Sequence, residues 1–116
     1  MSENLKFGFV VAPVGEKGLD DGALYQEVIA DCKLGQSLGY DSAWMLEHHF
    51  SDYFPTPSPL LFMSHVAAHC PGLSFGGSVI VAPWHHPLRL LGEISMLSNL
   101  TDGDLFIGMG RGTAKM

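Results

Sequence analysis

The sequence predicts an α/β protein built from parallel β-α units. Four apolar runs of strand length alternate with three segments of helical periodicity over 116 residues. Strands joined by helices of this length lie parallel and are connected by right-handed crossovers. A (β/α)8 barrel, or TIM barrel, typically needs about 250 residues. We therefore expect residues 1–116 to be a fragment that forms the first half of such a barrel. The alternative is a small doubly wound open sheet.

The first β-α unit begins with Leu5–Ala12, an apolar run rich in Phe and Val. We expect this run to be a strand buried on both faces. Ala23–Leu38 follows with apolar residues near helical spacing, and Asp20 or Asp21 is placed to cap it. Gly35 lies inside this helix, where glycine costs about 1 kcal/mol relative to alanine, so we expect tight packing there.

The second and third strands are predicted at Asp41–Leu46 and Leu73–Ala82. Between them, a proline-rich loop leads into a helix over Pro59–His69, with Ser58 as its N-cap. The pair Gly76-Gly77 lies within the third strand, where glycine indicates a bulge or a close backbone approach.

A third helix is predicted to begin at Pro87, after the short loop Pro83–His86. Asp104–Met109 is predicted as the fourth strand, and Gly110–Thr113 as the loop after it. An open half-barrel exposes its strand edges, so we expect activity of the whole barrel rather than of the fragment. The apolar residues of the third helix that we expect to face inward are Leu88, Leu91, Ile94, Met96, Leu97 and Leu100.

Charge and cysteine content exclude several classes of function. The net charge is −6 and the six Lys and Arg residues are scattered, so neither nucleic acid nor a membrane is a predicted partner. Cys32 and Cys70 match no metal or redox spacing, and we expect reduced, buried thiols in a cytoplasmic protein. His65 and His69 are four residues apart, but no third ligand accompanies them. We predict no metal site and assign both histidines to one helix face, at a dimer interface.

The cluster Glu47-His48-His49-Phe50 directly follows the second strand. Parallel α/β folds place their chemistry outside the carboxyl ends of the strands, so these side chains are candidates for acid–base chemistry. The stretch Phe50–Pro59 is rich in aromatic residues and prolines and is expected to wall a pocket. The alternative is that the histidines cap the strand and form only local hydrogen bonds.

Three motifs occur in order and at a characteristic spacing: Trp44–Phe50, Pro83–Arg89 and Asp104–Gly112. Each motif alone is weak. Together they resemble the bacterial luciferase-like flavin-dependent monooxygenases, and the likeness runs from Leu5 to Gly112.

The resemblance implies a TIM-barrel enzyme that binds reduced FMN, or the deazaflavin F420 in some relatives. Monooxygenase members of the family react the reduced flavin with O₂ and oxidise a small apolar organic substrate. They receive the reduced flavin from a separate reductase and are usually homodimers. The first half of the barrel supplies the active-site histidine and much of the flavin wall.

The resemblance assigns the catalytic role to His48, which would hold or relay a proton near the flavin. His49 points the other way on an extended backbone, and its alternative role is a structural hydrogen bond. Glu47 is expected to orient one of these rings or to cap the strand end. Phe50 and Tyr53 are expected to line the substrate pocket.

The expected flavin contacts come from the later motifs. Ser78 and Val79 lie where the family carries a non-prolyl cis peptide beneath the flavin ring, and the alternative is an ordinary strand. Arg111 is the expected phosphate contact, or else a surface arginine. His86 matches a histidine beside the flavin, or else serves the start of a helix. Gly110 replaces a reactive cysteine of the light-emitting luciferases, which argues against light emission.

Two further functions stay open. The same fold can carry an F420-dependent hydride-transfer oxidoreductase, which would reduce F420 with an alcohol or a related donor. The other is a non-catalytic flavin-binding module, which would bind flavin without turnover.

Overall fold

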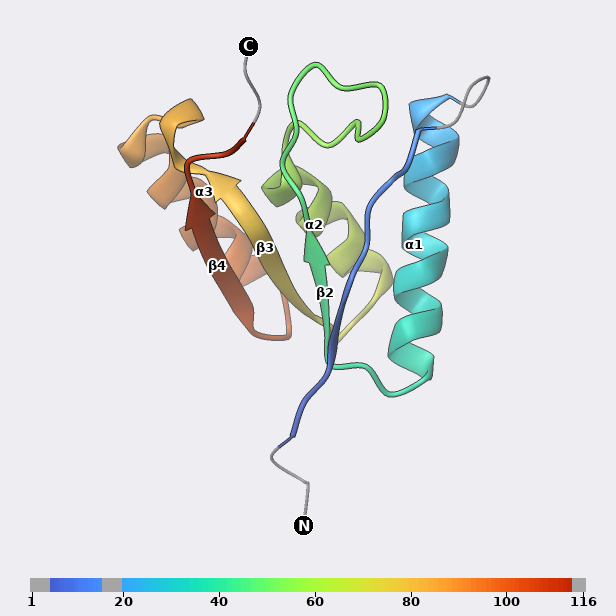
Figure 1. The fold of residues 1–116 in the computed structure, drawn as a ribbon. Coiled ribbons are helices and arrows are strands. Elements are labelled where there is room, and N and C mark those ends of the chain that lie inside the picture. The colour runs from blue at the N-terminus through green and yellow to red at the C-terminus, as the bar shows by residue number, and fades with distance from the viewer. Residues whose placement is uncertain (1–4, 16–19, 114–116) are drawn as a thin grey trace.

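The sheet is parallel throughout. The computed structural model describes residues 5–15 and 20–113. The four strands are hydrogen-bonded in the order β1-β2-β3-β4, and the labelled arrows in Figure 1 point to one edge. The predicted alternation of strands and helices is confirmed. The elements are β1 (Gly8–Val10), α1 (Asp21–Ser37), β2 (Ser42–Met45), α2 (Pro59–His69), β3 (Ser74–Val81), the 3-10 helix η1 (Ala82–Trp84), α3 (Pro87–Leu100) and β4 (Leu105–Gly110).

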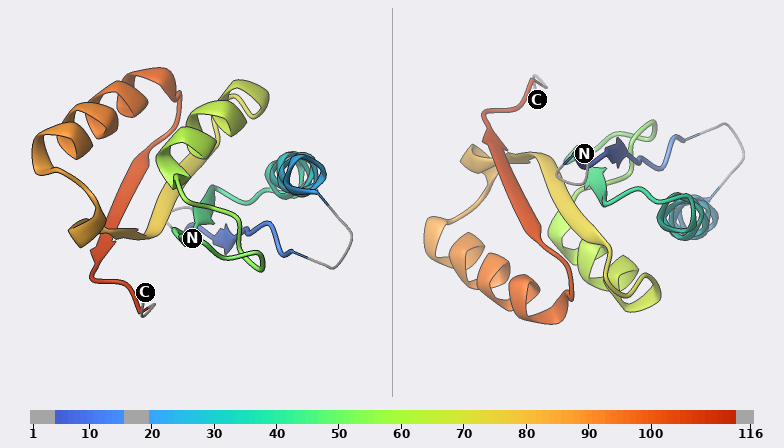
Figure 2. Two further views of the ribbon diagram at one scale, coloured as in Figure 1. Left: turned by 90° about the horizontal axis from the view of Figure 1, so that it is seen from above. Right: turned by 90° about the horizontal axis from the view of Figure 1, so that it is seen from below.

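The three helices lie on one side of the sheet (Figure 2). The other side carries no helix among the described residues. There Trp44 and Phe106 stack with their ring centroids 5.5 Å apart. None of the helices that the structure describes combines the length and the apolarity needed to cross a bilayer. The apolar core lies between the helices and the sheet and includes Val28, Cys32, Met45, Met63, Val66, Phe75, Ile80, Leu90 and Leu97.

Local signals position the helices much as predicted. The Asp20 carboxylate accepts a hydrogen bond from the backbone N–H of Ala23 at 2.7 Å and caps α1. A Cβ added at Gly35 would lie 2.6 Å from the Phe9 ring, so the expected tight packing is confirmed. Helix α2 has the predicted bounds, but the Ser58 side chain forms no capping hydrogen bond.

The prediction that Leu5–Ala12 is a strand buried on both faces is wrong. The strand is limited to β1, and Leu5, Phe7 and Val10 are 61%, 58% and 65% exposed. Strand β1 is at the edge of the sheet and pairs only with β2 in the part of the chain that the structure describes. Phe9 packs against Gly35 of α1, and alternation along the strand points Val10 to the opposite face, which no described helix covers.

The predicted inward face of α3 is also largely wrong. Leu90 and Leu97 are the buried residues of this helix, and Ile94 is partly buried against the core. Among the described elements, α3 packs against α2 and, through Leu90 and Leu97, against the core between the helices and the sheet. Residues on its remaining surface therefore stay in solvent. Four of the residues expected to face inward are more than half exposed: Leu88, Leu91, Met96 and Leu100.

The Trp44 indole lies against the backbone of β3. A Cβ added at Gly76 would overlap the indole ring, which also stacks on Phe106 and donates a hydrogen bond to the Ser42 hydroxyl at 2.9 Å. The close approach predicted at Gly76-Gly77 is therefore confirmed, and its partner is a side chain. The register between β3 and β4 also shifts, between Gly77 and Ile80.

We predict that Gly76→Ala lowers the free energy of unfolding by about 1–3 kcal/mol, because the indole cannot move aside without losing these contacts. Urea unfolding measures the change. Gly92→Ala on α3 is the matched control, since a Cβ there meets nothing within 4 Å. The control should stabilise the helix by about 0.4–1 kcal/mol. Equal effects of the two substitutions would contradict the packing described.

Both cysteines are free and buried. Burial raises the pKa of the Cys32 thiol to about 12, with smaller contributions from Cys70 and Asp31. Below the ordinary pKa of 9.0, the thiol is protonated in the folded and the unfolded chain alike. Between that value and about 12, the unfolded chain loses this proton first, so folding stability must fall as the pH rises.

We therefore expect the free energy of unfolding to decrease from pH 9 to pH 11, and to decrease less in Cys32→Ala. Denaturant titrations at the two pH values measure both slopes. A Cys32→Ala slope equal to that of the parent protein would show that this thiol does not contribute.

Candidate active site

A cavity of about 200 Å³ lies at the edge of the sheet where the strands end. Parallel strands deliver the residues that follow them to one edge, which explains why distant segments meet here. The cavity gathers four of the predicted site residues, His48, Ser78, Val79 and Arg111. Its full lining is Glu47, His48, His49, Ser78, Val79, Val81, Trp84, Arg111, Gly112 and Thr113.

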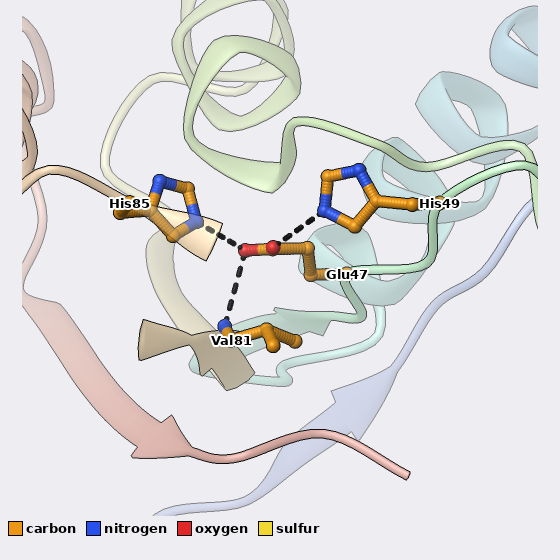
Figure 3. Close-up of polar contacts among 4 residues, drawn as sticks. All are labelled: Glu47, His49, Val81 and His85. Atoms are coloured by element: carbon orange, nitrogen blue, oxygen red, sulfur yellow. Dashed lines mark hydrogen bonds and ion pairs between the residues drawn. The ribbon is translucent and has the colours of Figure 1, made fainter. Parts of the chain in front are cut away.

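A buried carboxylate joins the segments that follow β2 and β3 (Figure 3). Glu47 Oε1 accepts hydrogen bonds from His85 Nε2 at 2.8 Å and from the Val81 backbone N–H at 3.1 Å. Its Oε2 accepts one from His49 Nε2 at 2.7 Å. The Glu47 side chain is 0% exposed. The expectation that Glu47 orients a neighbouring ring is therefore confirmed for His49.

Three donors compensate for the burial of this carboxylate. An unpaired carboxylate away from water is strongly unfavourable, whereas one that accepts several hydrogen bonds is tolerated. A carboxylate only accepts, so both Nε2 atoms carry hydrogen, an assignment that follows from the hydrogen-bond network. The sequence-based prediction missed His85. Its only signal was the pair His85-His86, which repeats the pattern of His48-His49.

His48 is half-buried and lines the same cavity. Its ring stacks on Phe54 with centroids 5.0 Å apart, and its backbone N–H donates to the Thr56 carbonyl at 3.0 Å. The peptide bond between Ser78 and Val79 is cis, as the resemblance implied. The loop after β4 brings Arg111 to the same cavity.

The structure does not bring the other predicted site residues to this cavity. His86 Nδ1 accepts a hydrogen bond from the Leu88 backbone N–H at 3.2 Å, which is the helix-start role given as its alternative. Phe50 and Tyr53 are 93% and 59% exposed on the loop after β2. Phe50 has a φ of 54°, which turns the chain there. Contact of these three residues with flavin or substrate stays a prediction.

The histidine pair on α2 is separate from this site. The rings of His65 and His69 are 5.0 Å apart. Within residues 5–15 and 20–113, no group of three or more His, Cys, Asp or Glu side chains is placed to hold a metal ion.

Comparison with known proteins agrees with this geometry. Residues 5–116 match the family model of the luciferase-like monooxygenases. The chain belongs to this family. The oxygenase component of a flavin-dependent trigonelline monooxygenase from Acinetobacter baylyi is 34% identical over 89 residues, which are 77% of this chain and 25% of that protein.

Solved structures of luciferase-like monooxygenases share the fold. The oxygenating constituent of 3,6-diketocamphane monooxygenase from Pseudomonas putida, in complex with FMN, matches with a TM-score of 0.86 and 25% identity. The match covers 94% of this chain and 30% of that one. Monooxygenase RslO1 from Streptomyces bottropensis matches with a TM-score of 0.85 and 29% identity, over 94% of this chain and 34% of that one. The chain thus spans about a third of these TIM-barrel proteins, and the predicted fold class is confirmed.

Proposed function

We propose that the protein is a flavin-dependent monooxygenase that uses reduced FMN and O₂ to oxidise a small apolar organic substrate. The observation that carries the proposal is the meeting of His48, the Ser78-Val79 peptide and Arg111 at one cavity. Membership of the luciferase-like family supports it. Further support comes from the FMN in the diketocamphane monooxygenase structure and from the flavin dependence named for the trigonelline relative.

The residues at the cavity fit a flavin phosphate and one face of its ring. Arg111 forms no ion pair with a carboxylate among the described residues, so its guanidinium is available to an anion. The cavity of about 200 Å³ is smaller than the roughly 300–1,000 Å³ of typical cofactor pockets, so these residues provide only part of the wall.

Each group has a distinct proposed task. Reduced flavin supplies the electrons that activate O₂. Arg111 would hold the phosphate, while Ser78 and Val79 would support the ring. The His48 imidazole would hold or move a proton beside it, as a general acid or base.

We also propose a separate flavin reductase as a partner, which the words "oxygenase component" in the name of the trigonelline relative support. A second copy of the chain is proposed to cover the groove between α2 and α3. Leu61, Met96 and Leu100 line this groove and are 71%, 66% and 54% exposed, a large apolar surface to leave in water. The free thiols favour a cytoplasmic location.

The reaction of bound flavin with O₂ tests the function. We expect the protein to change the rate or the spectrum of reoxidation when anaerobically reduced FMN is mixed with oxygenated buffer, because the site shields the flavin from water. Stopped-flow absorbance follows the reaction. Reoxidation identical to that of free FMN, together with reduction of F420 by an alcohol, would favour the hydride-transfer alternative.

Arg111→Ala tests the assignment of the phosphate contact. We expect FMN affinity to fall about 10- to 100-fold, because a hydrogen-bonded contact to a charged group contributes about 1.5–3 kcal/mol. Flavin fluorescence titration measures the change. Arg89→Ala is the matched control, since Arg89 is an exposed arginine of α3 that pairs with Glu93. Riboflavin, which lacks the phosphate, should bind both variants equally; a loss of riboflavin affinity in Arg111→Ala would contradict a phosphate contact.

A further inference from the structure

We propose that His49 is a second proton-handling imidazole of this site, and that Glu47 and His85 are positioning residues that fix its tautomer. The inference extends the proposed function, on which it rests, from His48 to its neighbour. In Figure 3, the Glu47 carboxylate lies between the two rings and accepts a hydrogen bond from His85 on one side and from His49 on the other.

The two carboxylate oxygens of Glu47 accept different numbers of hydrogen bonds. Oε1 of Glu47 accepts from two donors, His85 Nε2 and the Val81 backbone N–H, and both belong to the segment at the end of β3. Rotation of the carboxylate would break both bonds at once. Oε2 is thereby left facing the one donor on the β2 side, His49 Nε2 at 2.7 Å.

The Glu47 side chain is fully buried, whereas the His49 side chain is partly exposed. The Glu47 side chain is 0% exposed, so water does not compete for its oxygens, while the His49 side chain is 22% exposed. A hydrogen on His49 Nε2 is required by this acceptor, which leaves Nδ1 as the nitrogen able to exchange a proton with the cavity. Stacking on Trp84, with centroids 5.0 Å apart and ring planes at 23°, holds the orientation of the ring.

His49 lies on the wall of the cavity that His48 also lines. No described residue forms a hydrogen bond with His49 Nδ1. A ligand group that gives up a proton can transfer it to Nδ1, and the imidazolium so formed remains paired with the Glu47 carboxylate. The proton returns to the ligand from the same atom. The His48 ring, by contrast, stacks on Phe54 and forms no hydrogen bond with a described residue.

The tautomers are measurable without a cofactor. In long-range ¹H–¹⁵N spectra of the ¹⁵N-histidine-labelled protein, we expect hydrogen on Nε2 in both His49 and His85. The signals are assigned with the variants His49→Gln and His85→Gln. Glu47→Gln offers one acceptor oxygen and one NH₂ donor, so one of the two rings must move its hydrogen to Nδ1. Glu93→Gln, which alters an exposed carboxylate on α3, should change neither ring.

The parent spectrum decides the tautomer even if Glu47→Gln does not fold. Hydrogen on Nδ1 of His49 in the parent protein would overturn the proposal, and so would unchanged tautomers in a folded Glu47→Gln variant. The His65 and His69 signals report whether the variant keeps its fold.

The functional part is tested by the FMN reaction. We expect His49→Gln to slow the reaction of bound reduced flavin with O₂ about 100-fold or more while FMN affinity changes less than about twofold, as for loss of a general acid or base. An unchanged rate would overturn the role of His49. Failure of the parent protein to bind FMN would instead reject the proposed function and leave the measured tautomers standing.

Discussion

The Glu47 carboxylate is buried away from solvent where β2 and β3 end. It is tolerated there because three donors from two segments meet it, and those donors in turn hold His49 and His85 in place. The exposed pair of Arg89 and Glu93 on α3 shows the contrast, since water can replace either partner. The geometry of one wall of the cavity therefore depends on a single buried side chain directly after a strand.

The parallel sheet divides the molecule into regions with different tasks. Its helix-covered side holds the apolar core, and its other side carries the stacked rings of Trp44 and Phe106 over Gly76. The carboxyl edge holds the polar groups, because in parallel strands all the segments that leave the sheet do so at that edge. The diketocamphane monooxygenase, which was solved with FMN, and monooxygenase RslO1 share this arrangement over 30% and 34% of their chains.

Local features of the fold can be predicted from the sequence, and features that depend on neighbours cannot. Helix α2 and the Asp20 cap follow from proline, capping and periodicity within a few residues. The burial of Leu5–Ala12 and of the α3 leucines depends on which elements lie alongside, and no local pattern contains that information. In the site, the composition of the cluster after β2 indicated acid–base chemistry. The sequence did not show that His85, and not His86, contacts Glu47, because the turn of η1 decides which of the two rings faces the site. The cis Ser78-Val79 peptide followed only from the family resemblance.

We propose that flavin lies at the carboxyl edge of the sheet, and the most direct test is a map of backbone amide shifts during titration of the ¹⁵N-labelled protein with FMN. We predict that the largest shifts occur at residues 47–49, 78, 79, 81 and 111–113, which line the cavity there. A second cavity, of about 560 Å³, lies at the amino edge and is lined by Asp41, Gly72 and Asp104 among others. Largest shifts at those residues would contradict a flavin site at the carboxyl edge.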